Sequence, residues 1–214
     1  MKADFAVPRV KICGITREED LVAAIAAGAS AIGFVEYPAS PRAVTRERAH
    51  ALIAGIAGRV PAVAVLVDRD PDFAAAWMRA TGATVVQLCG SERADAWKGF
   101  DFPILRRVAA AENAEAEIAA WQGIAAAFVL DHPSAPGGTG LGVDAARAAI
   151  LARLAPCLLA GGLDEINVRA RVHAVVPAGV DASSRLEISP GIKDPARVAA
   201  FVRAAAETLQ EIGS

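Results

Sequence analysis

The feature that most constrains the fold of this 214-residue chain is a series of eight short apolar segments, each followed by a longer, alanine-rich stretch of helical character. The apolar segments are 10–13 (VKIC), 31–35 (AIGFV), 62–67 (AVAVLV), 84–88 (TVVQL), 103–108 (PILRRV), 126–131 (AAFVLD), 157–161 (CLLAG) and 179–183 (GVDAS). Because a helix is expected between consecutive strands, the strands should be parallel. Their nearly continuous Val, Ile and Leu content is typical of a parallel sheet covered by helices.

Two α/β architectures fit eight such units: an open doubly wound sheet or a closed (β/α)8 TIM barrel. No Gly-x-Gly-x-x-Gly motif follows the first segment, where CGIT (13–16) stands instead. The count of eight favours the barrel, although the chain is short for one. No linker-like or low-complexity stretch divides the sequence, so residues 1–214 are predicted to form a single-domain (β/α)8 barrel.

Several residues predict where helices begin and end. Thr16 and Glu19 have the spacing of a capping box, and Gly28 stands where that helix should end. Capping aspartates are expected before three later helices, at Asp70, Asp164 and Asp194.

Composition excludes several classes of function. The formal net charge is −2 and no block of Lys and Arg occurs, so neither nucleic-acid nor membrane binding is expected. The three cysteines are widely spaced and form no CxxC pair, which argues against a disulfide framework and a structural zinc site. The N-terminus lacks the apolar region of a signal peptide, and no apolar stretch is long enough to span a membrane. The sequence therefore predicts a soluble, cytoplasmic protein.

In a barrel, chemistry is expected where the strands end. Lys11 and Cys13 lie two residues apart on one strand and so face the same side. A nearby ammonium lowers the pKa of a thiol, which would make Cys13 a usable base. Alternatively, Lys11 is neutralised by a carboxylate, and Cys13 is only a small buried residue. Asp131 ends another strand, either as a turn residue or as an acid with a raised pKa.

The segments after the last two predicted strands resemble a phosphate site. Gly161 and Gly162 precede an expected helix start, where backbone N–H groups can face an anion. Ser183 and Ser184 stand at the matching point of the last strand. The alternative is that the glycines only turn the chain and the serines only cap.

Motifs along nearly the whole chain resemble one known family. They are KICGITREED (11–20), GFVEYPASPRAV (33–44), VQLCG (86–90), LD (130–131) with GGTG (137–140), LAGGLDEINV (159–168) and GVDASSRLEISPGIKD (179–194). Together they are similar to the N-(5'-phosphoribosyl)anthranilate isomerases of tryptophan biosynthesis.

The resemblance implies an Amadori rearrangement of a phosphosugar–anthranilate substrate, with no cofactor and no metal. It implies that Asp131 is the general acid and Cys13 the general base. Arg42 would pair with the anthranilate carboxylate, a task suited to a guanidinium. Asp181 would bind the sugar hydroxyls. The expected partner is this small-molecule substrate, with no nucleic acid and no membrane, and the protein is expected to be a monomer or a homodimer.

Three residues depart from the family pattern. Cys89 stands where histidine is common, Arg185 where glycine is common, and Glu36 where an aromatic or aliphatic residue is common. Competing hypotheses are another phosphosugar isomerase and a non-catalytic phosphosugar-binding barrel. A thiol redox or metal protein is disfavoured because Cys157 begins its strand, at the opposite end of a barrel from Cys13.

Overall fold

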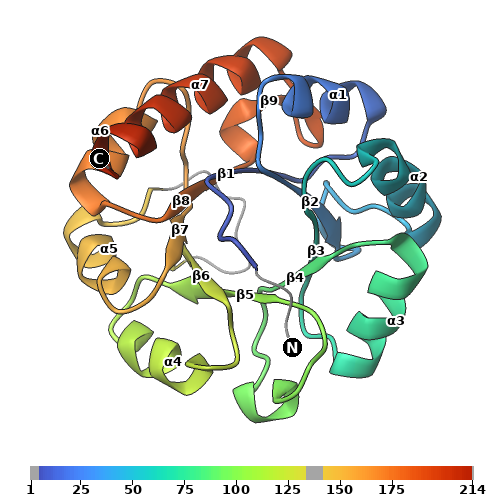
Figure 1. Cartoon of the computed structure of the whole chain (residues 1–214), viewed down its shortest axis with the longest axis horizontal. Coiled ribbons are helices and arrows are strands. Elements are labelled where there is room, and N and C mark those ends of the chain that lie inside the picture. The colour runs from blue at the N-terminus through green and yellow to red at the C-terminus, as the bar shows by residue number, and fades with distance from the viewer. Residues whose placement is uncertain (1–4, 134–141, 214) are drawn as a thin grey trace.

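The structure, a computed structural model, describes residues 5–133 and 142–213. Its eight parallel strands form a closed barrel in which each strand pairs with the next and the last pairs with the first (Figure 1). The strands are β1 (Val10–Cys13), β2 (Ala31–Glu36), β3 (Ala62–Leu66), β4 (Val85–Leu88), β5 (Ile104–Ala109), β6 (Ala127–Asp131), β7 (Cys157–Leu159) and β8 (Gly179–Ala182). Closure, with Lys11 of β1 opposite Asp181 of β8, confirms the TIM barrel and rules out the open sheet.

Helices surround the barrel on its outer side (Figure 1). They are α1 (Glu18–Ala26), α2 (Arg46–Ile56), α3 (Pro71–Thr81), α4 (Ala114–Trp121), α5 (Ala145–Ala152), α6 (Val168–Val175) and α7 (Pro195–Ile212). Between β4 and β5 the expected α-helix is replaced by a four-residue 3-10 helix, η1 (Ala94–Trp97). An aromatic cluster fills this connection, since the Trp97 and Phe100 rings lie 4.9 Å apart and Phe100 also contacts Phe102.

A short addition that the sequence did not predict separates β8 from α7. It consists of a 3-10 helix, η2 (Ser184–Leu186), and an antiparallel hairpin of β9 (Glu187–Ser189) and β10 (Ile192–Lys193). Both charged ends of this hairpin, Glu187 and Lys193, are buried. The hairpin therefore brings two charges into the protein beside the end of β8.

Several helix-boundary predictions are confirmed. The Asp70 carboxylate accepts a hydrogen bond from the Phe73 N–H at 2.8 Å and caps α3. Asp194 accepts from two backbone N–H groups at the start of α7. Gly28 follows α1 with a φ of 96°, a conformation that favours glycine at helix ends.

Two other capping predictions are wrong. The Thr16 hydroxyl donates to the carbonyl of Gly191 at 2.6 Å, so it binds the β9–β10 hairpin instead of capping α1, whose N-cap is Arg17. Asp164 does accept backbone N–H bonds, from Ile166 and Asn167, but α6 begins only at Val168. The aspartate therefore stabilises a separate turn that precedes the helix.

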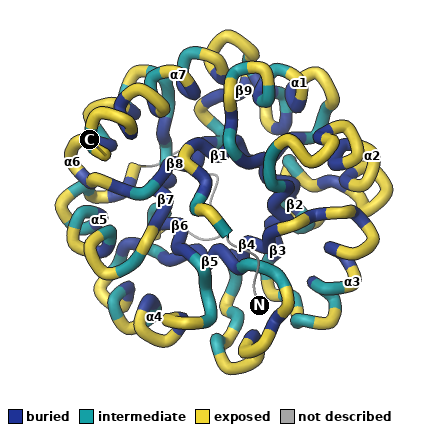
Figure 2. The backbone as a smooth tube through the Cα atoms, in the orientation of Figure 1, coloured by how far each residue is buried: buried dark blue, intermediate teal, exposed yellow. Residues whose placement is uncertain are grey.

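Alternation along the strands divides the core into two layers. One layer lies between barrel and helices, and the strands are dark blue in Figure 2 whereas the outer helix faces are yellow. The other layer fills the barrel interior with small and branched side chains, and Phe5 and Val7 pack against it. Within the described ranges, no helix is long and apolar enough to cross a membrane.

Candidate active site

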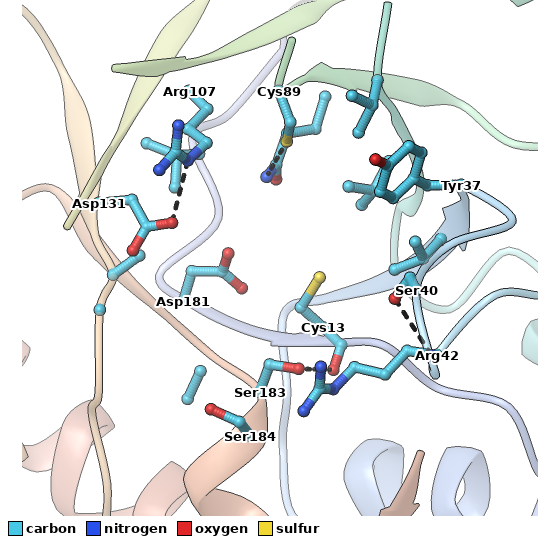
Figure 3. A pocket seen from close by; sticks show the side chains of 18 of the residues that line it. Cys13, Tyr37, Ser40, Arg42, Cys89, Arg107, Asp131, Asp181, Ser183 and Ser184 are labelled. Atoms are coloured by element: carbon cyan, nitrogen blue, oxygen red, sulfur yellow. Dashed lines mark hydrogen bonds and ion pairs between the residues drawn. The ribbon is translucent and has the colours of Figure 1, made fainter. Parts of the chain in front are cut away.

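A cavity of about 460 Å³ opens where the barrel strands end (Figure 3). All the residues that the sequence singled out as catalytic or substrate-binding line it: Cys13, Arg42, Asp131, Gly161, Gly162, Asp181, Ser183 and Ser184. They come from β1, β6, β8, the start of η2 and the loops after β2, β7 and β8. The barrel thus gathers residues that lie far apart along the chain into one site.

Lys11 and Asp181 form a buried ion pair. The Lys11 Nζ donates to Asp181 Oδ1 at 2.8 Å, and the lysine is fully buried. This confirms the alternative in which a carboxylate neutralises Lys11. Burial lowers the pKa of Lys11, but the charges of Asp181 and Cys13 outweigh it and raise this pKa overall.

The expectation that Lys11 brings the Cys13 thiol below its ordinary pKa is wrong in its net direction. Burial raises the pKa of Cys13, and the opposing charges of Lys11 and Lys193 only reduce that rise. A buried thiolate loses its hydration, which disfavours the charged form. Cys13 in the free protein is therefore held mainly as the thiol.

Asp131 is fixed by two donors at the end of β6. Its Oδ2 accepts from Arg107 Nε at 3.0 Å, and its Oδ1 accepts from the His132 N–H at 2.8 Å. The sequence did not single out Arg107 from its neighbour Arg106. Strand alternation separates them, because Arg107 lines the cavity whereas Arg106 pairs with Glu92 and Glu117 away from it.

The loops after β7 and β8 meet at one end of the cavity. Gly161 and Gly162 both have positive φ, 79° and 62°, and the Ser183 hydroxyl donates to the Cys13 carbonyl at 3.0 Å. The predicted helix start directly after the glycines is wrong, because the turn of Asp164 comes before α6. At this end of the cavity, η2 begins at Ser184.

Gly14, directly after Cys13, could not be another residue without disturbing the site. Its φ is 75°, and a Cβ there would lie 2.6 Å from Cδ of Arg42 and 3.1 Å from Oγ of Ser183. Glycine is thus required both by the backbone turn and by the close approach of two cavity residues.

A buried network behind the cavity holds Arg42. Glu187 accepts from Arg42 Nε and Nη2, both at 2.8 Å, and from Lys193 Nζ at 2.7 Å. Lys193 also donates to the carbonyl of Ser183 at 3.2 Å. Burial lowers the pKa of Lys193, and the Glu187 charge opposes this. The sequence assigned no role to Glu187 or Lys193, although both lie within the GVDASSRLEISPGIKD motif.

The three departures from the family pattern have different surroundings. Cys89 lines the cavity, and burial raises the pKa of its thiol to about 12. Arg185 lines the cavity mouth and pairs with Asp164 Oδ2 at 3.3 Å, which links the loops after β7 and β8. Glu36 pairs with Arg69 from the loop after β3 through two hydrogen bonds of 2.8 Å.

The GGTG motif at 137–140 lies outside the described residues. In the remainder of the chain, no group of three or more His, Cys, Asp or Glu side chains is placed to hold a metal ion.

A closed barrel of eight parallel strands, with acid, thiol and guanidinium groups around a cavity at the strand ends, defines a TIM-barrel enzyme. The family model described as N-(5'phosphoribosyl)anthranilate (PRA) isomerase matches residues 10–204. The chain belongs to this family and is an isomerase.

Known relatives agree over almost the full length. The N-(5'-phosphoribosyl)anthranilate isomerase of Chromohalobacter salexigens is 41% identical over 209 residues, covering 94% of this chain and 95% of that protein. The Myxococcus xanthus enzyme is 42% identical over 203 residues, covering 92% and 95%.

Solved structures agree as well. The Thermus thermophilus phosphoribosyl anthranilate isomerase superposes with a TM-score of 0.84 at 33% identity, covering 93% of this chain and 98% of that one. A phosphoribosyl anthranilate isomerase in complex with reduced 1-(o-carboxyphenylamino)-1-deoxyribulose 5-phosphate gives a TM-score of 0.82 at 28% identity, covering 94% and 100%.

Proposed function

We propose that Asp131 and Cys13 are the general acid and general base that convert N-(5'-phosphoribosyl)anthranilate to 1-(2-carboxyphenylamino)-1-deoxyribulose 5-phosphate. The observation that carries this proposal is that a carboxyl and a thiol line one cavity together with an arginine and two glycine- and serine-containing loops. An acid and a base on either side of a sugar are what an aldose–ketose isomerisation requires.

The substrate is positioned in the proposal by its two anionic ends. Its phosphate lies against the backbone of Gly161 and Gly162 and the hydroxyls of Ser183 and Ser184, which line one end of the cavity. Its anthranilate carboxylate pairs with Arg42. Since Glu187 already engages Nε and Nη2 of Arg42, the carboxylate is left with Nη1 and the outer edge of Nη2. Asp181 accepts hydrogen bonds from the sugar hydroxyls.

The reaction begins with two proton transfers and ends with a tautomerisation. Asp131 protonates the furanose ring oxygen, the C1'–O bond breaks, and the nitrogen lone pair forms a protonated imine. The Cys13 thiolate removes the proton from C2', and the electron pair of that C–H bond forms the C1'–C2' double bond of an enolamine. Tautomerisation moves the hydroxyl proton to C1' and yields the ketone. The protonated imine accepts the electrons, so the chemistry needs no cofactor.

The surroundings of Cys13 support its role as a base despite its raised pKa. Lys11 and Lys193 both favour the thiolate, which lowers the cost of ionising the Cys13 thiol before it accepts the proton from carbon. A base of higher pKa is also the stronger base once ionised, which suits a weakly acidic C–H bond.

The experiment that tests the assignment is steady-state kinetics of Cys13→Ala and Asp131→Asn. A positioned acid or base typically contributes about 10²–10⁴-fold, and each variant should lose kcat within that range while remaining folded. Cys157→Ala, which removes a buried thiol at the start of β7, is the matched control and should keep its activity. A Cys13 or Asp131 variant that retained more than about a tenth of wild-type kcat would overturn its role.

If the wild-type protein bound the substrate but did not convert it, the alternative of a non-catalytic phosphosugar-binding barrel would be favoured.

The proposal also includes a cytoplasmic location and either a monomer or a homodimer. The Thermotoga maritima relative is described as dimeric, with monomers generated from it. Sedimentation at several protein concentrations would determine the oligomeric state of this chain.

A further inference from the structure

One polar group in the cavity wall has no hydrogen-bond partner among residues 5–133 and 142–213, which the structure describes. Gln87 lies on β4 and lines the cavity with only 4% of its surface exposed. Its Nε2 donates to Sγ of Cys89 at 3.3 Å. Its Oε1 is buried and accepts no hydrogen bond from the part of the chain that the structure describes. Buried polar groups are nearly always paired, so an unpaired carbonyl facing a cavity needs an explanation.

Cys89 determines which end of the amide is available to a ligand. Gln87 and Cys89 are two residues apart and therefore face the same side of the wall. Burial raises the pKa of the Cys89 thiol to about 12, so its sulfur stays uncharged near neutral pH. The sulfur accepts a hydrogen bond from the Gln87 amide N–H, and the carbonyl oxygen is the end left unpaired among the described residues. A histidine, common at position 89 in the family, would add a titratable group here.

The position of this oxygen selects a particular part of the ligand. Figure 3 shows Cys89 between Arg107 and Tyr37, on a wall away from Cys13, Ser183 and Arg42. Ser183 and Arg42, the proposed partners of the phosphate and the carboxylate, both lie near Gly14 on the opposite wall, so β4 faces neither anionic group. Apart from the ring oxygen, which Asp131 protonates in the proposal, the remaining polar groups of the substrate are sugar hydroxyls and the amine N–H, and each of these can donate a hydrogen bond.

We propose that Gln87 Oε1 accepts a hydrogen bond from a neutral O–H or N–H donor of the substrate, and that Cys89 positions the amide for this contact. The inference rests on the proposed function. It makes Gln87 a specificity-determining residue, because a ligand without that donor leaves the buried oxygen unpaired.

The test compares wild type with Gln87→Met, which keeps the length of the side chain and removes its polar end. The probe is reduced 1-(o-carboxyphenylamino)-1-deoxyribulose 5-phosphate, measured by titration calorimetry. Its Kd should rise roughly tenfold, as expected when a substrate donor is left without its acceptor. Inorganic phosphate, which occupies only the phosphate end, should inhibit both proteins equally.

A thermal unfolding measurement without ligand separates this role from a structural one. Removal of an unpaired buried oxygen should leave the Tm unchanged or raise it, whereas loss of a structural contact would lower it. Equal Kd values for the probe, or equal losses for probe and phosphate, would overturn the inference. Gln87→Leu serves if the methionine variant does not fold. Failure of the wild type to bind the probe would instead count against the proposed function itself.

Cys89→Ala tests the positioning role. It should weaken probe binding by a smaller factor than Gln87→Met, because the amide keeps its oxygen but loses its orientation. In the Gln87→Met background, the same change should have no further effect, since residues that act through one another are not additive. An equal loss in both backgrounds would show that Cys89 acts without Gln87.

Discussion

Glu187 is the residue through which the ligand end of Arg42 is connected to the protein interior. A single carboxylate with a side chain only 4% exposed binds both Arg42 and Lys193. Two cations against one anion leave a net positive charge beside the cavity, which suits an anionic ligand. A buried carboxylate of this kind is costly unless all its partners are present. The network therefore constrains Arg42 to one orientation.

Replacement of Glu187 by glutamine should raise the KM for substrate several-fold more than it lowers kcat. The two-point clamp on Arg42 is lost, while the acid and base are untouched. Glu36→Gln is a matched control, because Glu36 holds Arg69 through the same pair of 2.8 Å bonds without binding a cavity arginine. KM should not change in that variant. A parallel fall of kcat and kcat/KM in Glu187→Gln would instead place Arg42 in transition-state stabilisation.

The ionisation of Cys13 can be measured directly by its rate of alkylation with iodoacetamide, read by mass spectrometry on the peptide that contains it. Only the thiolate reacts, and burial raises the pKa of Cys13 above its ordinary value of 9.0. The rate should thus still be rising above that pH. Lys11→Met should move the midpoint further upward, since it removes a charge that favours the thiolate. Lys98→Met, at an exposed lysine, should leave it unchanged. A midpoint that stays in place in Lys11→Met would limit Lys11 to its ion pair.

Strand alternation accounts for how much of the site could be predicted. Cys13, Asp131 and Asp181 lie on the inner side of predicted strands near their ends, and the structure has them at the cavity. The partners of these residues could not be predicted. The contact between Arg107 and Asp131 depends on the register of β5 and β6. The contact between Glu187 and Arg42 depends on a hairpin that no local sequence pattern indicated.

At the scale of helices and strands, predictions that rest on local chemistry were correct where no distant group competes. Asp70 caps α3 because its nearest donor is the N–H of Phe73. Thr16 does not cap α1 because its hydroxyl donates a hydrogen bond to the carbonyl of Gly191, which lies far along the chain. The connection between β4 and β5 contains a 3-10 helix and a packed aromatic cluster instead of the expected α-helix. In both cases, a tertiary contact outweighs local helix propensity.

Asp70→Ala should lower the free energy of unfolding by about 1 kcal/mol, the usual cost of losing an N-cap. Asp72→Ala, in the first turn of the same helix but not at its cap, should lower the free energy of unfolding by only about a few tenths of a kcal/mol. Neither residue lines the cavity, so kcat/KM should be unchanged in both. Urea denaturation with an unchanged m-value is the measurement. Equal destabilisation by the two changes would show that the cap contributes nothing beyond its charge.

At the scale of the whole molecule, all three thiols are buried, and burial raises the pKa of each one. Folding therefore opposes their ionisation. A group whose pKa is higher in the folded state than in the unfolded state binds more protons when folded, and its contribution to stability falls as the pH rises between the two values. The barrel should thus lose stability in alkaline solution.

Cys157, at the start of β7 and away from the cavity, allows this effect to be isolated. Burial raises its pKa to about 12 from an ordinary value of 9.0, so its contribution to stability is fully present below pH 9.0 and is lost progressively as the pH approaches 12. Each pH unit within that interval costs about 1.4 kcal/mol. At a pH of about 10.5, the loss from this one thiol should be roughly 2 kcal/mol.

Cys157→Val has no proton to lose, while Cys13 and Cys89 contribute equally to both proteins. Urea denaturation of both proteins at about pH 8 and about pH 10.5 should therefore show a smaller alkaline loss in the variant, by roughly that amount. Parallel losses in the two proteins would mean that the Cys157 thiol ionises as easily in the folded barrel as in the unfolded chain.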